Sequence, residues 1–158
     1  FLDEIGDMNL SMQAKILRAL QEDATVSTSD LAARIGLSQA PCWRRIRRLE
    51  EIGVIAKRAA ILDRNRVGLP VLIFTTVRLA THAARTLAEF EDAIRGFPEV
   101  IECHKLMGAA DHLLKIVVPS VEAYEKFFRE KLSQLPAVRE ANSAIALSEV
   151  KSTTSLPI

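Results

Sequence analysis

A short segment near the start of the chain contains two helical patterns separated by one tight corner, and this arrangement restricts how the segment can fold. Ser27 and Asp30 have the spacing of an N-terminal capping box, and Gly36 lies where the helix that they begin would end. Ser38 can cap a second helix, which Gly53 would stop. The sequence therefore predicts helix, turn and helix.

A separate helix is predicted just before this pair. Ser11 can cap it, and its apolar positions fall at helical spacing at Met12, Ile16, Leu17 and Leu20.

The second helix of the pair is strongly basic. Residues 31–49 contain five arginines and no acidic residue, although the net charge of the whole chain is only +1. At about 100° per residue, Cys42, Ile46 and Leu49 share one face and the arginines occupy the opposite one. A basic helix after a tight turn is typical of a recognition helix in the DNA major groove. We expect the DNA contacts from Ser38, Gln39, Ala40, Pro41, Trp43, Arg44, Arg47 and Arg48.

Two features beside this basic face have their own interpretation. Trp43 can pack against the first helix instead of contacting DNA. Residues 55–62 resemble a strand or β-wing, in which Lys57 and Arg58 are available for contacts with the DNA backbone.

The second half of the chain alternates strand and helix patterns. Strands are predicted at 71–79, 100–107, 113–118 and 145–150, and helices at 83–97 and 121–135. The two helices end alike, in Phe97-Pro-Glu-Val100 and Leu135-Pro-Ala-Val138, which indicates an internal duplication. The predicted fold class is α+β, with a winged helix-turn-helix followed by a ferredoxin-like βαββαβ domain.

Helices on one face of such a sheet leave its other face without a partner. Apolar residues point to both faces of the predicted strands. They include Leu72, Ile73, Phe74, Leu113, Leu114 and Ile116. We therefore expect a homodimer through the sheets, which would present two recognition helices to a pseudo-palindromic DNA site.

Several motifs in a common order resemble the Lrp/AsnC (leucine-responsive, feast/famine) transcription regulators. They are the run from Ser27 to Ile55, Glu102-Cys-His104, Gly108-Ala-Ala-Asp111 and Glu149-Val-Lys151, so the resemblance covers roughly residues 11–151. It implies a helix-turn-helix DNA-binding domain at 1–53, a β-wing and linker at 54–69, and an effector-binding and oligomerisation domain at 70–158. It also implies dimers that build tetramers or octamers, and an amino-acid effector.

In the family that the chain resembles, the turn at 108–111 lies between dimers, where effectors bind. Small residues there let a ligand approach backbone N–H groups, and Asp111 can hold an ammonium group. The ligand residues that follow are His104, Met107, Gly108, Ala109, Ala110 and Asp111. The alternatives are a plain hairpin whose Asp111 caps its own turn, and a metal site at His104, Asp111 and His112.

The first residues follow a different pattern. Residues 1–22 resemble the Walker B strand and adjoining helix of AAA+ activators of sigma-factor-dependent transcription, in which paired acids, here Asp3 and Glu4, hold Mg²⁺. The sequence contains no G-x-x-x-x-G-K-[ST] phosphate loop, so an ATPase is not predicted.

Composition excludes several other classes of protein. The sequence shows no apolar run long enough to cross a bilayer and no secretory signal pattern, which favours a cytoplasmic protein. Cys42 and Cys103 are predicted as buried thiols.

We predict a sequence-specific transcription regulator that uses double-stranded DNA and an amino-acid effector, without a cofactor. The alternatives are a DNA-compacting architectural protein and, less favoured, an enzyme on the ferredoxin-like domain.

Overall fold

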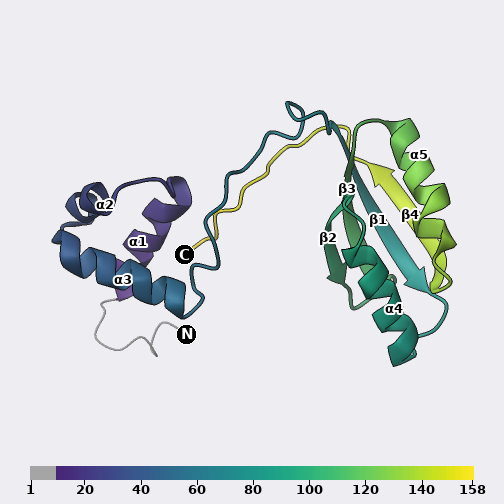
Figure 1. Ribbon diagram of the computed structural model, residues 1–158, viewed down its shortest axis with the longest axis horizontal. Coiled ribbons are helices and arrows are strands. Elements are labelled where there is room, and N and C mark those ends of the chain that lie inside the picture. Colours follow the sequence, from purple (N-terminus) through teal and green to yellow (C-terminus); the bar gives the residue numbers. More distant parts are fainter. Residues whose placement is uncertain (1–9) are drawn as a thin grey trace. The chain divides into compact units, whose positions relative to one another are not determined.

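The computed structural model describes residues 10–158, and the acidic pair Asp3 and Glu4 lies outside this range. The chain divides into two compact units, whose elements are labelled in Figure 1. The first runs to Ala60 and also includes Lys151–Ile158, and the second is Ile61–Val150.

Three helices form the first unit. They are α1 (Leu10–Glu22), α2 (Thr28–Ile35) and α3 (Gln39–Glu51). Helix α1 begins one residue before Ser11, so Ser11 lies inside the helix and not at the predicted cap. Each helix turns one apolar stripe inward, and together they bury Ile16, Ala19, Leu31, Ala32, Cys42, Ile46 and Leu49. No helix among the described residues is long and apolar enough to span a membrane.

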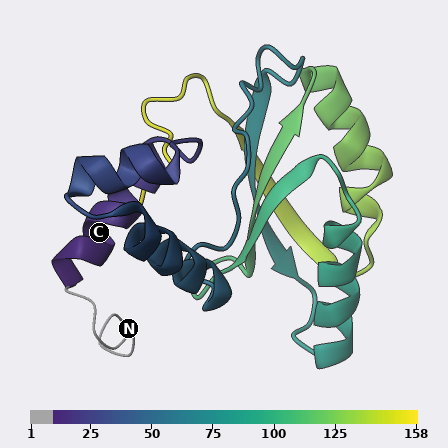
Figure 2. The same ribbon diagram turned by 60° about the vertical axis from the view of Figure 1, so that its left-hand side comes forward.

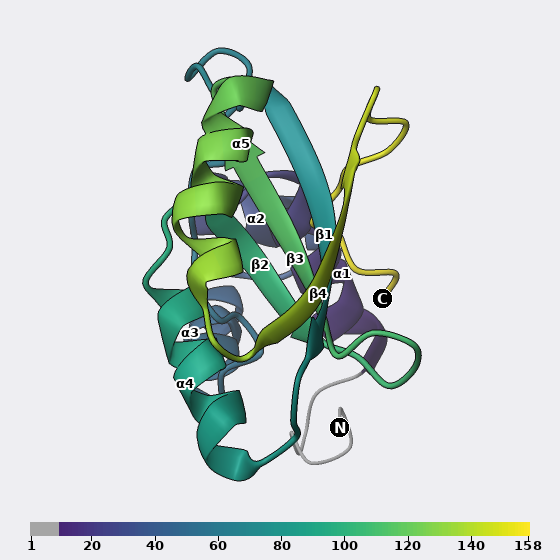
Figure 3. The same ribbon diagram turned by 90° about the vertical axis from the view of Figure 1, so that its right-hand side faces the viewer.

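The second unit is a four-stranded antiparallel sheet with two helices on one face (Figures 2 and 3). The strands lie in the order β2-β3-β1-β4. In chain order the elements are β1 (Val71–Leu79), α4 (Ala84–Arg95), β2 (Val100–Lys105), β3 (His112–Val118), α5 (Val121–Glu130), the 3-10 helix η1 (Leu132–Gln134) and β4 (Val138–Ile145). This is the predicted ferredoxin-like βαββαβ fold.

The core of this unit lies between the sheet and its helices. The central strands contribute Ile73, Val77, Leu114 and Ile116, and the helices contribute Phe90, Ile94 and Phe127. The hydroxyl of buried Thr75 lies 3.1 Å from the hydroxyl of Tyr124 and 3.0 Å from that of Ser143, so the one buried polar side chain of β1 is hydrogen-bonded.

The structure corrects three of the predicted elements. The last strand is Val138–Ile145 and not 145–150, because β4 pairs with β1 from Leu79↔Val138 to Ile73↔Ile145. The helix predicted at 121–135 ends at Glu130 and is followed by η1. Residues 55–62 form no strand, and within the described chain no strand lies between α3 and β1.

The C-terminal residues Lys151–Ile158 belong to the first unit and not to the ferredoxin-like domain where they are predicted. Gln21 of α1 binds the backbone of this segment through both the nitrogen and the oxygen of its side-chain amide. Its Nε2 donates to the Leu156 carbonyl at 3.2 Å, and its Oε1 accepts from the Leu156 N–H at 2.6 Å. Arg18 Nε donates to the Ile158 carbonyl, so two residues one turn apart on α1 bind this segment.

We expect Leu114→Ala to lower the free energy of unfolding by about 2–5 kcal/mol, because it leaves a cavity between the sheet and its helices. Leu114 is fully buried, whereas Leu147 is 99% exposed, so Leu147→Ala is the matched control and should change stability little. Urea denaturation of both variants measures this. Equal losses would place Leu114 outside the core.

Candidate nucleic-acid interface and ligand sites

The corner between α2 and α3 is held by local hydrogen bonds. Ser27 Oγ accepts from the Asp30 N–H at 3.0 Å and so caps α2 as predicted. At the other end Gly36 has φ 74°, a left-handed conformation that favours glycine, and the Leu37 N–H closes the helix on the Ala32 carbonyl at 2.9 Å. These bonds set the direction in which α3 leaves the corner.

Helix α3 has two faces of opposite character. Cys42, Ile46 and Leu49 are buried against the other helices. The predicted DNA-contacting residues all lie at the N-terminus and outer side of the helix. Seven are exposed and Pro41 is half-buried: Ser38, Gln39, Ala40, Pro41, Trp43, Arg44, Arg47 and Arg48. Ser38 occupies the N-cap position, but its hydroxyl makes no capping hydrogen bond, unlike the prediction.

Trp43 is exposed by 53%, which does not favour its packing against α1. The guanidinium of Arg47 instead lies 5.7 Å from the centre of the indole ring, in cation–π contact. Arg47 also pairs with Glu50 at 3.6 Å, and Arg48 pairs with Glu51 at 3.7 Å. Exposed pairs of this kind are weak, so a phosphate can replace the carboxylate.

The two basic residues after α3 differ in their contacts: Arg58 is bound to other residues of the first unit, whereas Lys57 is in no ion pair within the described chain. Arg58 donates to the Ala24 carbonyl at 3.0 Å and pairs with Glu50 at 3.2 Å. Arg58 therefore attaches the segment after α3 to the helices. Its guanidinium already has protein partners, although it was predicted, with Lys57, to contact the DNA backbone. Lys57 forms no ion pair with any described residue.

The predicted ligand turn joins β2 to β3 at residues 106–111. The Asp111 N–H donates to the Val77 carbonyl at 2.9 Å, and the Leu106 N–H donates to the Asp111 carbonyl at 2.8 Å, so the base of the turn is attached to β1. Arg78 Nε donates to the Ala109 carbonyl at 2.5 Å. Among the described residues, the backbone N–H groups of Gly108, Ala109 and Ala110 have no hydrogen-bond partner.

Asp111 does not cap its own turn. One carboxylate oxygen accepts from the Leu79 N–H at 2.7 Å, and the other lies 2.8 Å from Nε2 of His82. The hydrogen bond from the Leu79 N–H and the contact with His82 hold the pKa of Asp111 below its usual range. The carboxylate is therefore charged near neutral pH and holds β1 and the β1–α4 loop to the turn.

The other residues predicted for ligand binding lie on β2 and in the turn that follows it. Met107, Gly108 and Ala109 are exposed, Ala110 is half-buried, and exposed His104 contacts Glu102 at 3.0 Å. No group of three or more His, Cys, Asp and Glu side chains among the described residues is arranged to hold a metal ion.

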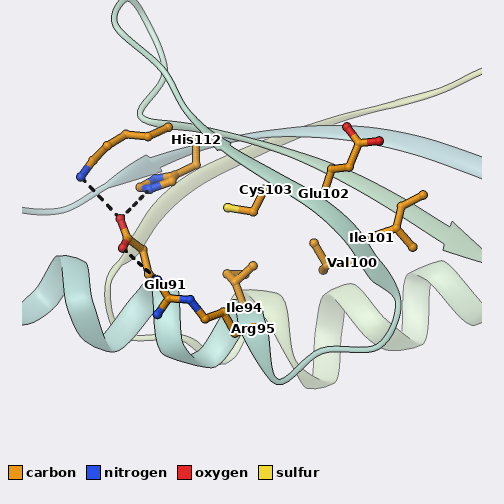
Figure 4. A pocket seen from close by; sticks show the side chains of 9 residues that line it. Glu91, Ile94, Arg95, Val100, Ile101, Glu102, Cys103 and His112 are labelled. Atoms are coloured by element: carbon orange, nitrogen blue, oxygen red, sulfur yellow. Dashed lines mark ion pairs between the residues drawn. The ribbon is translucent and has the colours of Figure 1, made fainter. Parts of the chain in front are cut away.

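A groove between α4 and β2 was not anticipated from the sequence (Figure 4). It has a volume of about 390 Å³, and its lining includes Glu91, Ile94, Arg95, Cys103, Lys105 and His112. Cys103 is exposed and not buried as predicted, because β2 is an edge strand of the sheet. Although the residue is exposed, neighbouring groove atoms partly desolvate its thiol and raise the pKa of that thiol, and the charge of Glu91 raises it further. The motif Glu102-Cys-His104 supplies two of its lining residues, Glu102 and Cys103, but the lining comes from three separate elements, so the motif alone does not predict the groove.

The matches to known families divide the chain between α3 and β1, as its structure does, but the second match extends into the C-terminal segment that packs with the first unit. Residues 12–56 match the winged helix-turn-helix DNA-binding family, and residues 72–156 match the Lrp/AsnC ligand binding domain. The DNA-binding transcriptional activator DecR of Escherichia coli is 31% identical over 144 residues, which cover 91% of this chain and 95% of DecR.

Two solved structures are similar over almost their whole length. An AsnC family transcriptional regulator from Agrobacterium tumefaciens is 42% identical with a TM-score of 0.89, and the match covers 95% of this chain and 97% of that one. A transcriptional regulator from Neisseria meningitidis in complex with L-methionine is 33% identical with a TM-score of 0.91, over the same shares of the two chains.

The charge on Asp111 is expected to stabilise the second unit only above acidic pH. Asparagine can still accept from the Leu79 N–H, so Asp111→Asn isolates the charge. Because the pKa is lowered on folding, the stability that the charge contributes is present above the unfolded value of about 3.8 and is lost as the pH falls through the folded value. Denaturation midpoints of the two proteins should differ at pH 7 and converge below about pH 4. A difference that stays constant down to pH 3 would contradict this.

Proposed function

The chain belongs to the Lrp/AsnC family of DNA-binding transcription regulators, and on that premise we propose that α3 is its recognition helix and that an amino acid at the turn 106–111 modulates it. The observation that carries the first part is the exposed arginine face of α3, directly opposite a face buried in the core.

The geometry of α3 suits the DNA major groove. Its N-terminal residues Ser38, Gln39 and Ala40 are exposed and would meet base edges. Arg44 forms no ion pair within the described chain, so its guanidinium can donate to guanine without losing an existing partner. Arg47 is held over the Trp43 ring, which limits its rotamers before DNA binds.

We expect Arg44→Ala and Arg47→Ala each to weaken binding to the cognate site by about 1–3 kcal/mol if the side chains read bases, with the oligomeric state unchanged. Arg129→Ala is the control, because Arg129 is an equally exposed arginine on α5, where it pairs with Glu125 at 3.0 Å. Fluorescence anisotropy with promoter and random DNA, each titrated with salt, measures these effects.

The salt titrations also separate a regulator from a DNA-compacting protein. A regulator prefers its own site over random DNA, whereas a compacting protein binds both alike with the same dependence on salt. Unchanged affinity in both α3 variants would place the recognition surface elsewhere.

The proposed effector site uses the backbone of the turn. The unpaired N–H groups of Gly108, Ala109 and Ala110 can donate to the carboxylate of an amino acid. The Asp111 oxygen that contacts His82 can instead accept a hydrogen bond from an ammonium group, while the other oxygen still accepts from the Leu79 N–H. The Neisseria relative, which has been solved with L-methionine, supports this class of ligand.

The proposed assembly is a homodimer through the sheet face that α4 and α5 leave uncovered, with tetramers or octamers built from it. Phe74 of β1 is 38% exposed on that face, opposite Lys115 of β3. A large apolar side chain at the centre of a sheet is expected to pack against another apolar surface. In such assemblies the turn 106–111 of one dimer would meet the next dimer, which would couple effector binding to oligomeric state.

We expect Ala109→Glu to weaken effector binding by roughly tenfold, because the added carboxylate repels the carboxylate of the ligand beside the N–H groups of the turn. Ala109→Gln has nearly the same size without the charge and should bind close to wild type. Ala109 is exposed, so both variants should fold. Calorimetric titration with L-methionine, followed by the other common amino acids, measures the affinities. Equal affinities for the two variants would remove this turn from the site.

A further inference from the structure

The groove between α4 and β2, which we call the α4–β2 groove, is lined by both apolar and polar side chains (Figure 4). Ile94 and Val100 are among its apolar residues, Glu91, Lys105 and His112 among its polar ones, and Glu102 lies beside Val100. Its volume of about 390 Å³ is within the range of small-molecule sites. It lies beside the edge strand β2, whose outer side is not covered by another strand of the sheet.

His112 is the unusual residue of this groove. Only 1% of it is exposed, yet neither ring nitrogen has a hydrogen-bond partner among the described residues. Its ring packs on Phe90 with 4.8 Å between the ring centres, and Nε2 lies 3.6 Å from Oε1 of Glu91, which is too long for a hydrogen bond. A buried polar side chain normally has a partner, so His112 carries unused hydrogen-bonding capacity toward the groove.

The charges beside His112 also leave donors unused. Lys105 Nζ lies 3.4 Å from Glu91 Oε1, and Arg95 lies 3.6 Å from the other oxygen of the same carboxylate. Charge-assisted bonds are usually about 2.7–2.9 Å long, so one carboxylate is shared loosely by three groups that can donate. Arg95 has a second partner in Asp92 at 2.5 Å, whereas Lys105 has three N–H groups and no other acidic partner within the described chain.

We propose that the α4–β2 groove binds a small aliphatic carboxylate, with its carboxylate accepting from Lys105 and His112 and its chain packed on Ile94 and Val100. An acceptor group complements His112, whose ring nitrogens have no hydrogen-bond partner among the described residues, and Lys105, which has only its long contact with Glu91. An ammonium group would instead compete with cations that already hold both carboxylates of the lining: Lys105 and Arg95 contact Glu91, and Lys115 pairs with Glu102 at 2.9 Å. This site is separate from the turn 106–111 and does not depend on the effector proposal made for that turn.

The three histidines of the chain allow the site to be located directly. His112 lines the groove, while His82 contacts Asp111 beside the turn. The full-length protein with ¹³C-labelled histidine would be titrated with 4-methylpentanoate and observed by NMR. The ring signals of His112 should shift in a saturable manner while those of His82 stay unchanged. The neutral isostere 4-methylpentanamide should cause much smaller shifts, because it lacks the carboxylate charge.

Charge variants test the contacts. Lys105→Gln should weaken the binding of 4-methylpentanoate by about tenfold, as expected for the loss of a hydrogen bond to a charged group. Arg85→Gln removes an exposed cation from α4, where Arg85 pairs with Glu89 and does not line the groove, and this variant should bind like wild type. Circular dichroism would show that both variants are folded.

Several results would overturn the proposal. One is the absence of a His112 shift, and another is an equal response to the amide. Unchanged affinity for 4-methylpentanoate in Lys105→Gln would show that Lys105 does not donate to the ligand carboxylate. Shifts at His82 without shifts at His112 would place the ligand at the turn 106–111 instead. Tighter binding of L-leucine than of 4-methylpentanoate would show that an ammonium group is recognised, which the donor arrangement does not provide.

Discussion

The pairing of β1 with a strand on each side is the interaction on which the second unit depends. β1 bonds to β3 from Val71↔Val118 to Val77↔His112, and to β4 along its other edge. This places His112 at the end of β3 beside α4, and it brings the turn 106–111 to the end of β1, where Asp111 bonds to Leu79. Both proposed ligand sites therefore take their positions from one central strand, although they use different residues and lie on different elements.

In the first unit, burial of one face of α3 has the corresponding role. Cys42, Ile46 and Leu49 can be buried only if the arginines of the same helix point outward, since residues on one helix are fixed at about 100° intervals. Most of the outer charge is only loosely compensated. Glu50 and Glu51 lie near the C-terminal end of α3, and their contacts with Arg47 and Arg48 are long and exposed. A phosphate backbone would offer shorter, bidentate contacts to the same guanidinium groups.

The turn and the α4–β2 groove differ in how they could recognise a ligand. The turn offers backbone N–H groups next to a charged carboxylate, so it presents a donor and an acceptor that together suit a zwitterion. The groove offers Lys105 and His112 beside a carboxylate that is already shared among three donors. Burial raises the pKa of Glu91, but Lys105 and His112 lower it by more, so the side chain stays ionised near neutral pH and keeps Lys105 in place.

Local sequence determined the elements whose signals lie within a few residues of one another. Ser27, Asp30 and Gly36 define the ends of α2, and the apolar period of α3 predicts which side is basic, because capping and helical spacing depend only on near neighbours in the chain. The tertiary structure decided what depends on distant partners. The polar strand β4 was missed because its residues are mostly exposed and only its pairing with β1 reveals it, and the exposure of Cys103 follows from the edge position of β2. The partners of Asp111 and the donors around His112 come from strands and helices that meet only after folding, so no local pattern records them.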